Sequence, residues 1–233
     1  MSNQRLDISR NTSALVLDFD GVMVDSDYVI ARRVIDVLEA AGVHVGVADI
    51  GHLFGSFENG AEWDDFLDTH LGGSYRVVDL RTDIAGPLSE AQDLLPLLPG
   101  VEEILIAAKS LNWLIGIATG QNRTRLEAYL NRFGIGEYFD EIVTGPEVSR
   151  GKPAPDIYLE VARRLRVDPV SCLAVEDSLP GVAAATAAGM NVLACPSRVT
   201  AHCRFPAGVP VVTSLVHLDL AAYVGSRRAS LGH

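Results

Sequence analysis

Residues 14–21 read Ala-Leu-Val-Leu-Asp-Phe-Asp-Gly, a short apolar run followed by two acidic residues and a glycine. An apolar run of this length is typical of a strand that is buried on both faces of a parallel sheet. Asp18 and Asp20 are two positions apart, so their side chains can point to the same side of the chain. Two crowded carboxylates repel each other unless a cation lies between them. The pair taken alone is equally compatible with an exposed polar turn.

Three later apolar runs repeat the pattern at residues 113–118, 172–175 and 192–195, and polar residues or a turn follow each run. Helical periodicity lies between the runs, in stripes that cover residues 104–111, 126–133 and 157–165. Alternating strands and helices indicate right-handed βαβ units, which bring the carboxyl ends of all strands to one sheet edge. The sequence therefore predicts an α/β fold with a doubly wound parallel sheet.

Residues 25–95 break this alternation, because they show helical periodicity without an intervening apolar strand. One apolar stripe covers residues 30–41 and a second covers residues 63–71, each closed by a glycine. Residues 89–92, Ser-Glu-Ala-Gln, have the pattern of a capping box that opens a third helix. We therefore predict a helical cap domain at residues 25–95, inserted into an α/β core domain formed by residues 1–24 and 96–233.

Composition and charge restrict the class of partner. The chain has 233 residues, a formal net charge of −11 and 48% hydrophobic residues, which is typical of a globular protein that does not bind nucleic acid. It has no apolar run long enough to span a bilayer and no signal-peptide pattern near its start, so we expect no membrane partner and a cytoplasmic location. The three cysteines lack the spacing of metal ligands. We expect a monomer or a simple homo-oligomer.

A second acidic site strengthens the interpretation of the first. Glu176 and Asp177 also follow an apolar strand, and two carboxylate sites on one sheet edge suit Mg²⁺, which prefers oxygen ligands. Gly21 allows backbone conformations and a close ligand approach that other residues prevent. Alone, each acidic site is a weak indication of metal binding.

Two further positions offer contacts for a phosphate. Thr119 and Gly120 end another strand and precede a helix, where a hydroxyl and free backbone amides suit phosphate oxygens, although a simple helix cap is the alternative. Lys152 lies in a proline-flanked loop, Gly-Lys-Pro-Ala-Pro-Asp at residues 151–156, which holds a cation in a restricted position. A solvated lysine is the alternative there.

The ordered combination is specific, and it resembles the four motifs of the haloacid dehalogenase superfamily, in the branch of beta-phosphoglucomutase and phosphoglycolate phosphatase-like enzymes. Motif one matches residues 18–26, motif two 118–120, motif three 151–156 and motif four 175–178. The resemblance covers nearly the whole chain and implies a Mg²⁺-dependent phosphatase for a small phosphorylated metabolite, either a sugar phosphate or a phospho-acid.

The resemblance also implies roles for individual residues. Asp18 would be the nucleophile that forms an aspartyl-phosphate, and Asp20 the general acid and base. Thr119, Gly120 and Lys152 would bind the phosphoryl group. The metal ligands would be Asp18, Asp20 through its backbone carbonyl, Glu176 and Asp177.

Departures from the family pattern separate the remaining alternatives. Ile30 and approximately Glu58 occupy the places where beta-phosphoglucomutases have a histidine and an arginine, which favours hydrolysis over a phosphosugar mutase. Residues 25–95 contain no lysine, which disfavours a phosphonatase, and the second aspartate of motif one disfavours a dehalogenase. A phosphoacceptor signalling module is the alternative of another class, and a catalytically silent binding protein is a further one. Four arginines, at positions 32, 33, 76 and 81, are candidates for contacts with the far end of a substrate, with a solvated helix face as the alternative.

Overall fold

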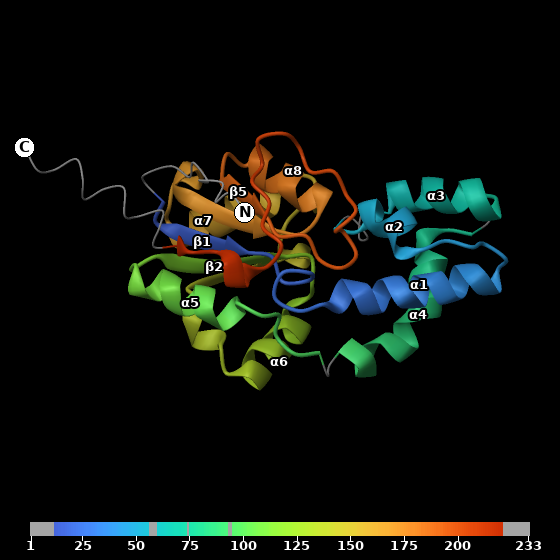
Figure 1. The fold of residues 1–233 in the computed structure, drawn as a ribbon, viewed down its shortest axis with the longest axis horizontal. Helices are drawn as coiled ribbons and strands as arrows, with labels where there is room; N and C mark the ends of the chain where they lie inside the picture. Colours follow the sequence, from blue (N-terminus) through green and yellow to red (C-terminus); the bar gives the residue numbers. More distant parts are fainter. Residues whose placement is uncertain (1–11, 56–59, 74, 93–94, 221–233) are drawn as a thin grey trace, which may run out of the picture.

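The computed structural model describes residues 12–55, 60–73, 75–92 and 95–220, without the side chains of residues 85–92. At its centre is a five-stranded parallel sheet in the order β3-β2-β1-β4-β5 (Figure 1). The strands are β1 (Ala14–Leu17), β2 (Leu114–Thr119), β3 (Glu141–Thr144), β4 (Cys172–Glu176) and β5 (Asn191–Ala194). Because β1 occupies the middle of the sheet, the residues that follow it lie at the centre of the carboxyl edge.

Helices cover both faces of this sheet. They are α5 (Val101–Ser110) and α6 (Arg123–Phe133) on one face, and α7 (Asp156–Leu165) and α8 (Leu179–Ala187) on the other. Leu15 and Leu17 of β1 pack in the cluster with α5 and α6, whereas Ala14 and Val16 pack in the cluster with α7 and α8. All four side chains are fully buried, which explains the continuous apolar run in the sequence. The predicted α/β fold with a doubly wound parallel sheet is confirmed.

A second group of helices lies beside the sheet rather than on it (Figure 1). It consists of α1 (Ser26–Ala40), α2 (Val47–Ile50), α3 (Ala61–Leu71) and α4 (Val77–Gln92). These helices bury a separate apolar cluster around Trp63, whose indole N–H donates to the carbonyl of Leu53 at 3.0 Å. The two chain segments that connect this group to the sheet run antiparallel where Val24 of one pairs with Leu97 of the other. The treatment of residues 25–95 as a separate cap domain stays a prediction.

Helix α4 corrects the sequence interpretation. Residues 89–92 form the last turn of α4 and do not open a helix, so the predicted capping box is wrong. The helix starts twelve positions earlier, at Val77, because carboxylates satisfy its first backbone donors: Asp79 accepts from the amide of Arg76 and Asp64 from that of Val77, both at 2.8 Å. Because proline is unfavourable inside a helix, the sequence pattern around Pro87 predicts a helix that starts after this residue.

Strand β3 has no counterpart in the sequence prediction. Only Ile142 and Val143 are apolar in its four residues, which is too short a run to predict a strand. It forms because it pairs with β2 at the sheet edge, with Ile117 opposite Ile142.

Among the described helices, none combines the length and apolar character needed to cross a membrane.

We predict that Trp63→Ala destabilises the protein by about 3–5 kcal/mol, because it removes a large, fully buried side chain and its hydrogen bond. The free energy of unfolding from urea titration measures the effect. Val78→Ala is the matched control on α4, since that side chain is 61% exposed, and it should change stability by less than about 0.5 kcal/mol. Equal losses in the two variants would contradict the assignment of Trp63 to the centre of the helical cluster.

Candidate active site

Acidic residues from two strand ends meet at the carboxyl edge of the sheet. Asp18 follows β1 and Asp177 follows β4, and these strands are neighbours with Leu17 opposite Val175. The connections from β1 and β4 leave in opposite directions, and such a switch point is where open α/β sheets bind ligands. Asp18, Glu176 and Asp177 each place a carboxylate oxygen within 4.8 Å of the others. The fold thus brings Asp18 next to Glu176 and Asp177, which lie more than 150 positions later in the sequence.

Gly21 permits the close approach of the motif-one turn to Asp177. Its φ is +74°, and a Cβ at this position would lie 2.1 Å from Oδ2 of Asp177. Any other residue would therefore have both backbone strain and a clash with a carboxylate of the cluster. The glycine is explained by the approach of the β1 turn to the residue after β4.

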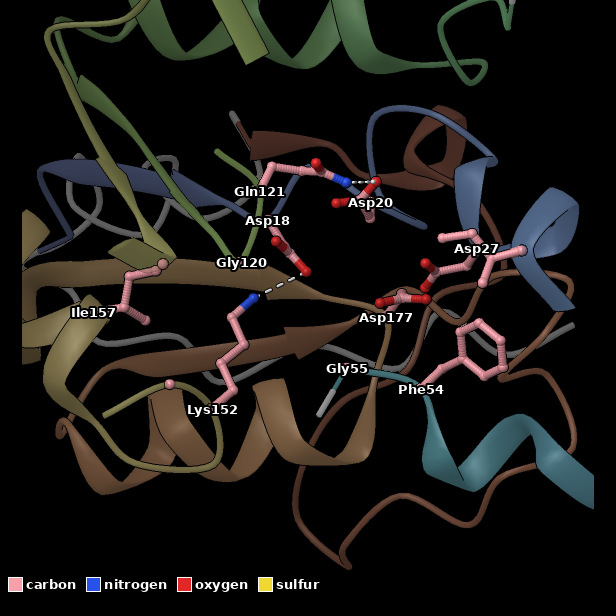
Figure 2. A pocket seen from close by; sticks show the side chains of 13 residues that line it. Asp18, Asp20, Asp27, Phe54, Gly55, Gly120, Gln121, Lys152, Ile157 and Asp177 are labelled. Atoms are coloured by element: carbon pink, nitrogen blue, oxygen red, sulfur yellow. Dashed lines mark hydrogen bonds and ion pairs between the residues drawn. The ribbon is translucent and has the colours of Figure 1, made fainter. Parts of the chain in front are cut away.

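Lys152 supplies positive charge within this cluster. Its side chain is buried, and Nζ lies 2.9 Å from Oδ2 of Asp18 and 2.6 Å from Oε1 of Glu176 (Figure 2). Burial alone would lower the pKa of Lys152, but the two carboxylates outweigh it and raise that pKa above its ordinary value. Lys152 is therefore a permanent cation beside Asp18.

Glu176 differs from the other two acids because it does not line the cavity, and both of its oxygens have protein partners. Lys152 and the hydroxyl of Tyr158 bind Oε1, and Ser178 donates to Oε2 at 3.3 Å. The side chain is fully buried and does not line the cavity described below. In this arrangement Glu176 holds Lys152 in place beneath the site.

The remaining acids are short of positive charge. Burial, and then the charge of Glu176, raise the pKa of Asp177 to about 7, although Ser197 donates a hydrogen bond to it and Lys152 opposes the shift. Thr200 also donates to Asp177, at 3.3 Å. Burial and the charge of Glu176 likewise raise the pKa of Asp18 well above its ordinary value. Oxygen ligands with this excess of negative charge suit a hard divalent cation.

Asp20 has different surroundings from Asp18. Its Oδ1 accepts hydrogen bonds from the hydroxyl of Ser26 and from Nε2 of Gln121, the latter at 3.1 Å. Burial raises the pKa of Asp20, and these two hydrogen bonds oppose the shift. A carboxyl group with a raised pKa keeps its proton closer to neutral pH, which suits a general acid.

A cavity of about 140 Å³ opens beside these groups (Figure 2). Its lining joins the sheet edge to the helical group: Asp18, Asp20, Gly120, Gln121, Gly145, Gly151, Lys152, Ile157 and Asp177 come from the first, and Asp27, Ile30, Phe54 and Gly55 from the second. Thr119 is fully buried at the end of β2, and its hydroxyl accepts from the amide of Gln121 at 3.2 Å. Gly120 and Lys152 therefore face the cavity, whereas Thr119 lies behind the lining.

Several lining residues were not among the sequence candidates. Asp27 and Phe54 come from the helical group, and no local pattern marks them, because an acid in the first turn of a helix is common. Gln121 follows the motif-two glycine, and its bond to Asp20 is formed only by folding. Within the described part of the chain, the lining includes Ile30 but none of the four candidate arginines of residues 25–95. Glu58 lies outside the described residues.

The family model of haloacid dehalogenase-like hydrolases matches residues 12–189 of this chain. The chain belongs to this family. The predicted membership of the haloacid dehalogenase superfamily is thereby confirmed, and the site described above lies within the matched region.

Relatives of this hydrolase include named phosphatases. The chain is 31% identical to hexitol phosphatase B of Escherichia coli over 193 residues, which cover 81% of this chain and 85% of that protein. It is 30% identical to a bifunctional riboflavin kinase/FMN phosphatase of Arabidopsis thaliana over 94% of this chain, and spans 57% of that protein. These names are consistent with the predicted class of phosphoric monoester hydrolase.

Solved structures show the same fold. The CbbY structure from Rhodobacter sphaeroides in complex with phosphate superimposes with a TM-score of 0.70 at 25% identity, over 91% of this chain and 99% of that chain. A beta-phosphoglucomutase from Clostridium difficile gives a TM-score of 0.72 over 93% of this chain and 99% of that chain, and its 23% identity shows the fold alone.

We predict that the metal-free protein becomes more stable as the pH falls from about 7 to about 5. The folded state raises the pKa of Asp177 from its ordinary 3.8 to about 7, so in this window the folded chain binds a proton that the unfolded chain lacks. Urea midpoints measured in the presence of a chelator test the slope. Asp177→Asn is the control, and its slope should be smaller; an equal slope in both proteins would assign the effect to other groups.

Proposed function

We propose that this hydrolase is a Mg²⁺-dependent phosphatase that acts on a small phosphorylated metabolite, a sugar phosphate or a phospho-acid, through an aspartyl-phosphate intermediate. The observation that carries the proposal is the position of Asp18, which lies between the cation of Lys152 and the carboxylate of Asp177 at the cavity. The phosphatase names of its relatives support the reaction type. Residues 25–95 would act as the cap domain that covers this cavity.

The donor set fits Mg²⁺. Asp18 and Asp177, together with the backbone carbonyl of Asp20, would hold the ion. Glu176 would coordinate it either directly or through a water molecule. Burial, and then the charge of Glu176, raise the pKa values of Asp18 and Asp177, and a bound cation would favour their ionised forms. When bound, Mg²⁺ neutralises negative charge on the carboxylates and on the phosphoryl group.

Asp18 would attack phosphorus while Asp20 donates a proton to the departing alcohol oxygen, which gives the free alcohol and an aspartyl-phosphate. Asp20, now a carboxylate, would then take a proton from the water that attacks the intermediate, which releases phosphate and restores Asp18. Ser26 and Gln121 orient Asp20 through their hydrogen bonds. Lys152 and the amide of Gly120 would stabilise charge on the phosphoryl oxygens, and Thr119 would do so behind them.

The proposal is tested with the purified protein, a panel of sugar phosphates, phospho-acids and nucleotides, and either Mg²⁺ or a chelator. We expect phosphate release that requires Mg²⁺ and that falls by about a thousandfold or more in Asp18→Asn, because that change removes the nucleophile. Asp36→Asn, an exposed carboxylate on α1, is the matched control and should retain activity. Activity that survives in Asp18→Asn would contradict the mechanism, and isomerised product without free phosphate would assign a mutase.

A separate prediction concerns the proton donated by Asp20. In Asp20→Asn we expect kcat/KM for an alkyl phosphate to fall by about 10²–10⁴, because an alkoxide is a poor leaving group without protonation. The loss should be much smaller for p-nitrophenyl phosphate, whose leaving group needs no proton. Comparison of kcat/KM for the two esters measures this, and an equal loss for both would rule out Asp20 as the general acid.

A further inference from the structure

Asp27 is a polar group in the cavity to which the proposed mechanism gives no role. It lies in the first turn of α1, its residue is 8% exposed, and it is part of the cavity lining. Within the described part of the chain its carboxyl group forms no hydrogen bond or ion pair. Its oxygens are not among the buried atoms that lack a partner, so they reach the cavity, where a ligand can bind to them.

The neighbours of Asp27 restrict the chemistry of that ligand. Phe54 lies near it at the cavity (Figure 2), and Ile30, three positions later on α1, adds a second apolar side chain to the lining. Among the described lining residues Lys152 is the single basic side chain, and it is already bound to Asp18 and Glu176. A second anionic group of a substrate would therefore find no further basic side chain among the described lining residues.

The charges around Asp27 also disfavour a second anionic group on the substrate. Asp177, Asp20 and Asp18 are the carboxylates whose charges act on it most strongly, in that order. A substrate carboxylate or second phosphate beside Asp27 would meet the carboxyl groups of Asp27 and Asp20, which are not carboxylate ligands in the proposed Mg²⁺ site. A hydroxyl group, by contrast, both donates and accepts, so it pairs with this carboxyl in either protonation state.

We propose that Asp27 is a specificity-determining residue that binds a hydroxyl group of the substrate close to the phosphoester. The enzyme then selects monophosphates with a neutral, hydroxyl-bearing remainder over phospho-acids and bisphosphates. The cavity volume suits a short remainder, since about 150 Å³ is enough for a benzene molecule. This inference rests on the proposed function, which leaves sugar phosphates and phospho-acids as equal candidates.

The test compares esters of equal length that differ in one feature. Glycerol 3-phosphate carries hydroxyl groups, n-propyl phosphate carries none, and 3-phosphoglycerate carries a carboxylate. We expect kcat/KM for glycerol 3-phosphate to exceed that for propyl phosphate by about tenfold or more, which is the usual effect of one buried hydrogen bond to a charged group. In Asp27→Ala this ratio should fall close to one, and in Asp27→Asn it should be partly retained, with relatively better turnover of 3-phosphoglycerate.

Two controls separate hydroxyl recognition from other roles of the residue. Asp36→Asn, on the exposed side of the same helix, should leave the ratio unchanged. The Mg²⁺ concentration for half-maximal activity should be the same in the parent protein and in Asp27→Ala. An unchanged ester ratio in Asp27→Ala would overturn the proposal, and so would an equal loss on all esters with a shifted Mg²⁺ requirement.

Binding measurements keep this outcome distinct from failure of the proposed function. Calorimetry with Asp18→Asn protein compares the affinities of glycerol 3-phosphate and propyl phosphate without turnover. A parent protein that releases no phosphate from any ester would contradict the phosphatase proposal. The affinity ratio, with and without Asp27→Ala, would still decide the role of Asp27.

Discussion

Repulsion among buried carboxylates is the constraint on which the site depends. The parallel pairing of β1 with β4 brings Asp18 and Asp177 to the same point of the sheet edge, with Glu176 beside them. Such a cluster is unfavourable unless cations compensate it. Lys152 compensates part of the charge, and its position depends in turn on Glu176. The raised pKa values of Asp18 and Asp177 show that compensation by protein groups is incomplete.

Two carboxyl groups two positions apart in the sequence have acquired different properties. Asp18 faces Lys152, which keeps a cation next to its carboxylate. Asp20 instead accepts hydrogen bonds from Ser26 and Gln121. Differing environments of neighbouring acids are a common basis for the division between nucleophile and proton donor. Contacts from distant segments, through Lys152 and Gln121, therefore distinguish the two proposed roles.

The helical group is connected to the site by more than its two chain connections. The loop after β5 carries Thr200, which donates to Asp177, and Val199, which is buried in the apolar cluster of the helical group. Arg198, which precedes these two residues in the same loop, stacks on the ring of Tyr28 in the first turn of α1, at 3.5 Å. A displacement of α1 relative to the sheet would therefore disturb contacts of Asp177. The first turn of α1 and the acidic cluster are thus parts of one packed arrangement.

The sequence by itself determined four of the five strands and most of the proposed chemistry. Apolar runs such as residues 14–17 and 172–175 can be buried only as central strands, so the polar residues after them must meet at one edge. Local patterns failed where an element depends on its neighbours, as in β3, which exists through its pairing with β2, and in the start of α4, which Asp64 stabilises from another helix.

Only the tertiary structure decided which side chains face the cavity. Thr119 and Glu176 lie behind its lining, whereas Asp27, Phe54 and Gln121 face it. Burial and the direction of a side chain depend on contacts between distant segments, and residue spacing along one strand or helix does not contain that information. The charge that a ligand meets is likewise a sum over several elements, and it exists only once they are packed together.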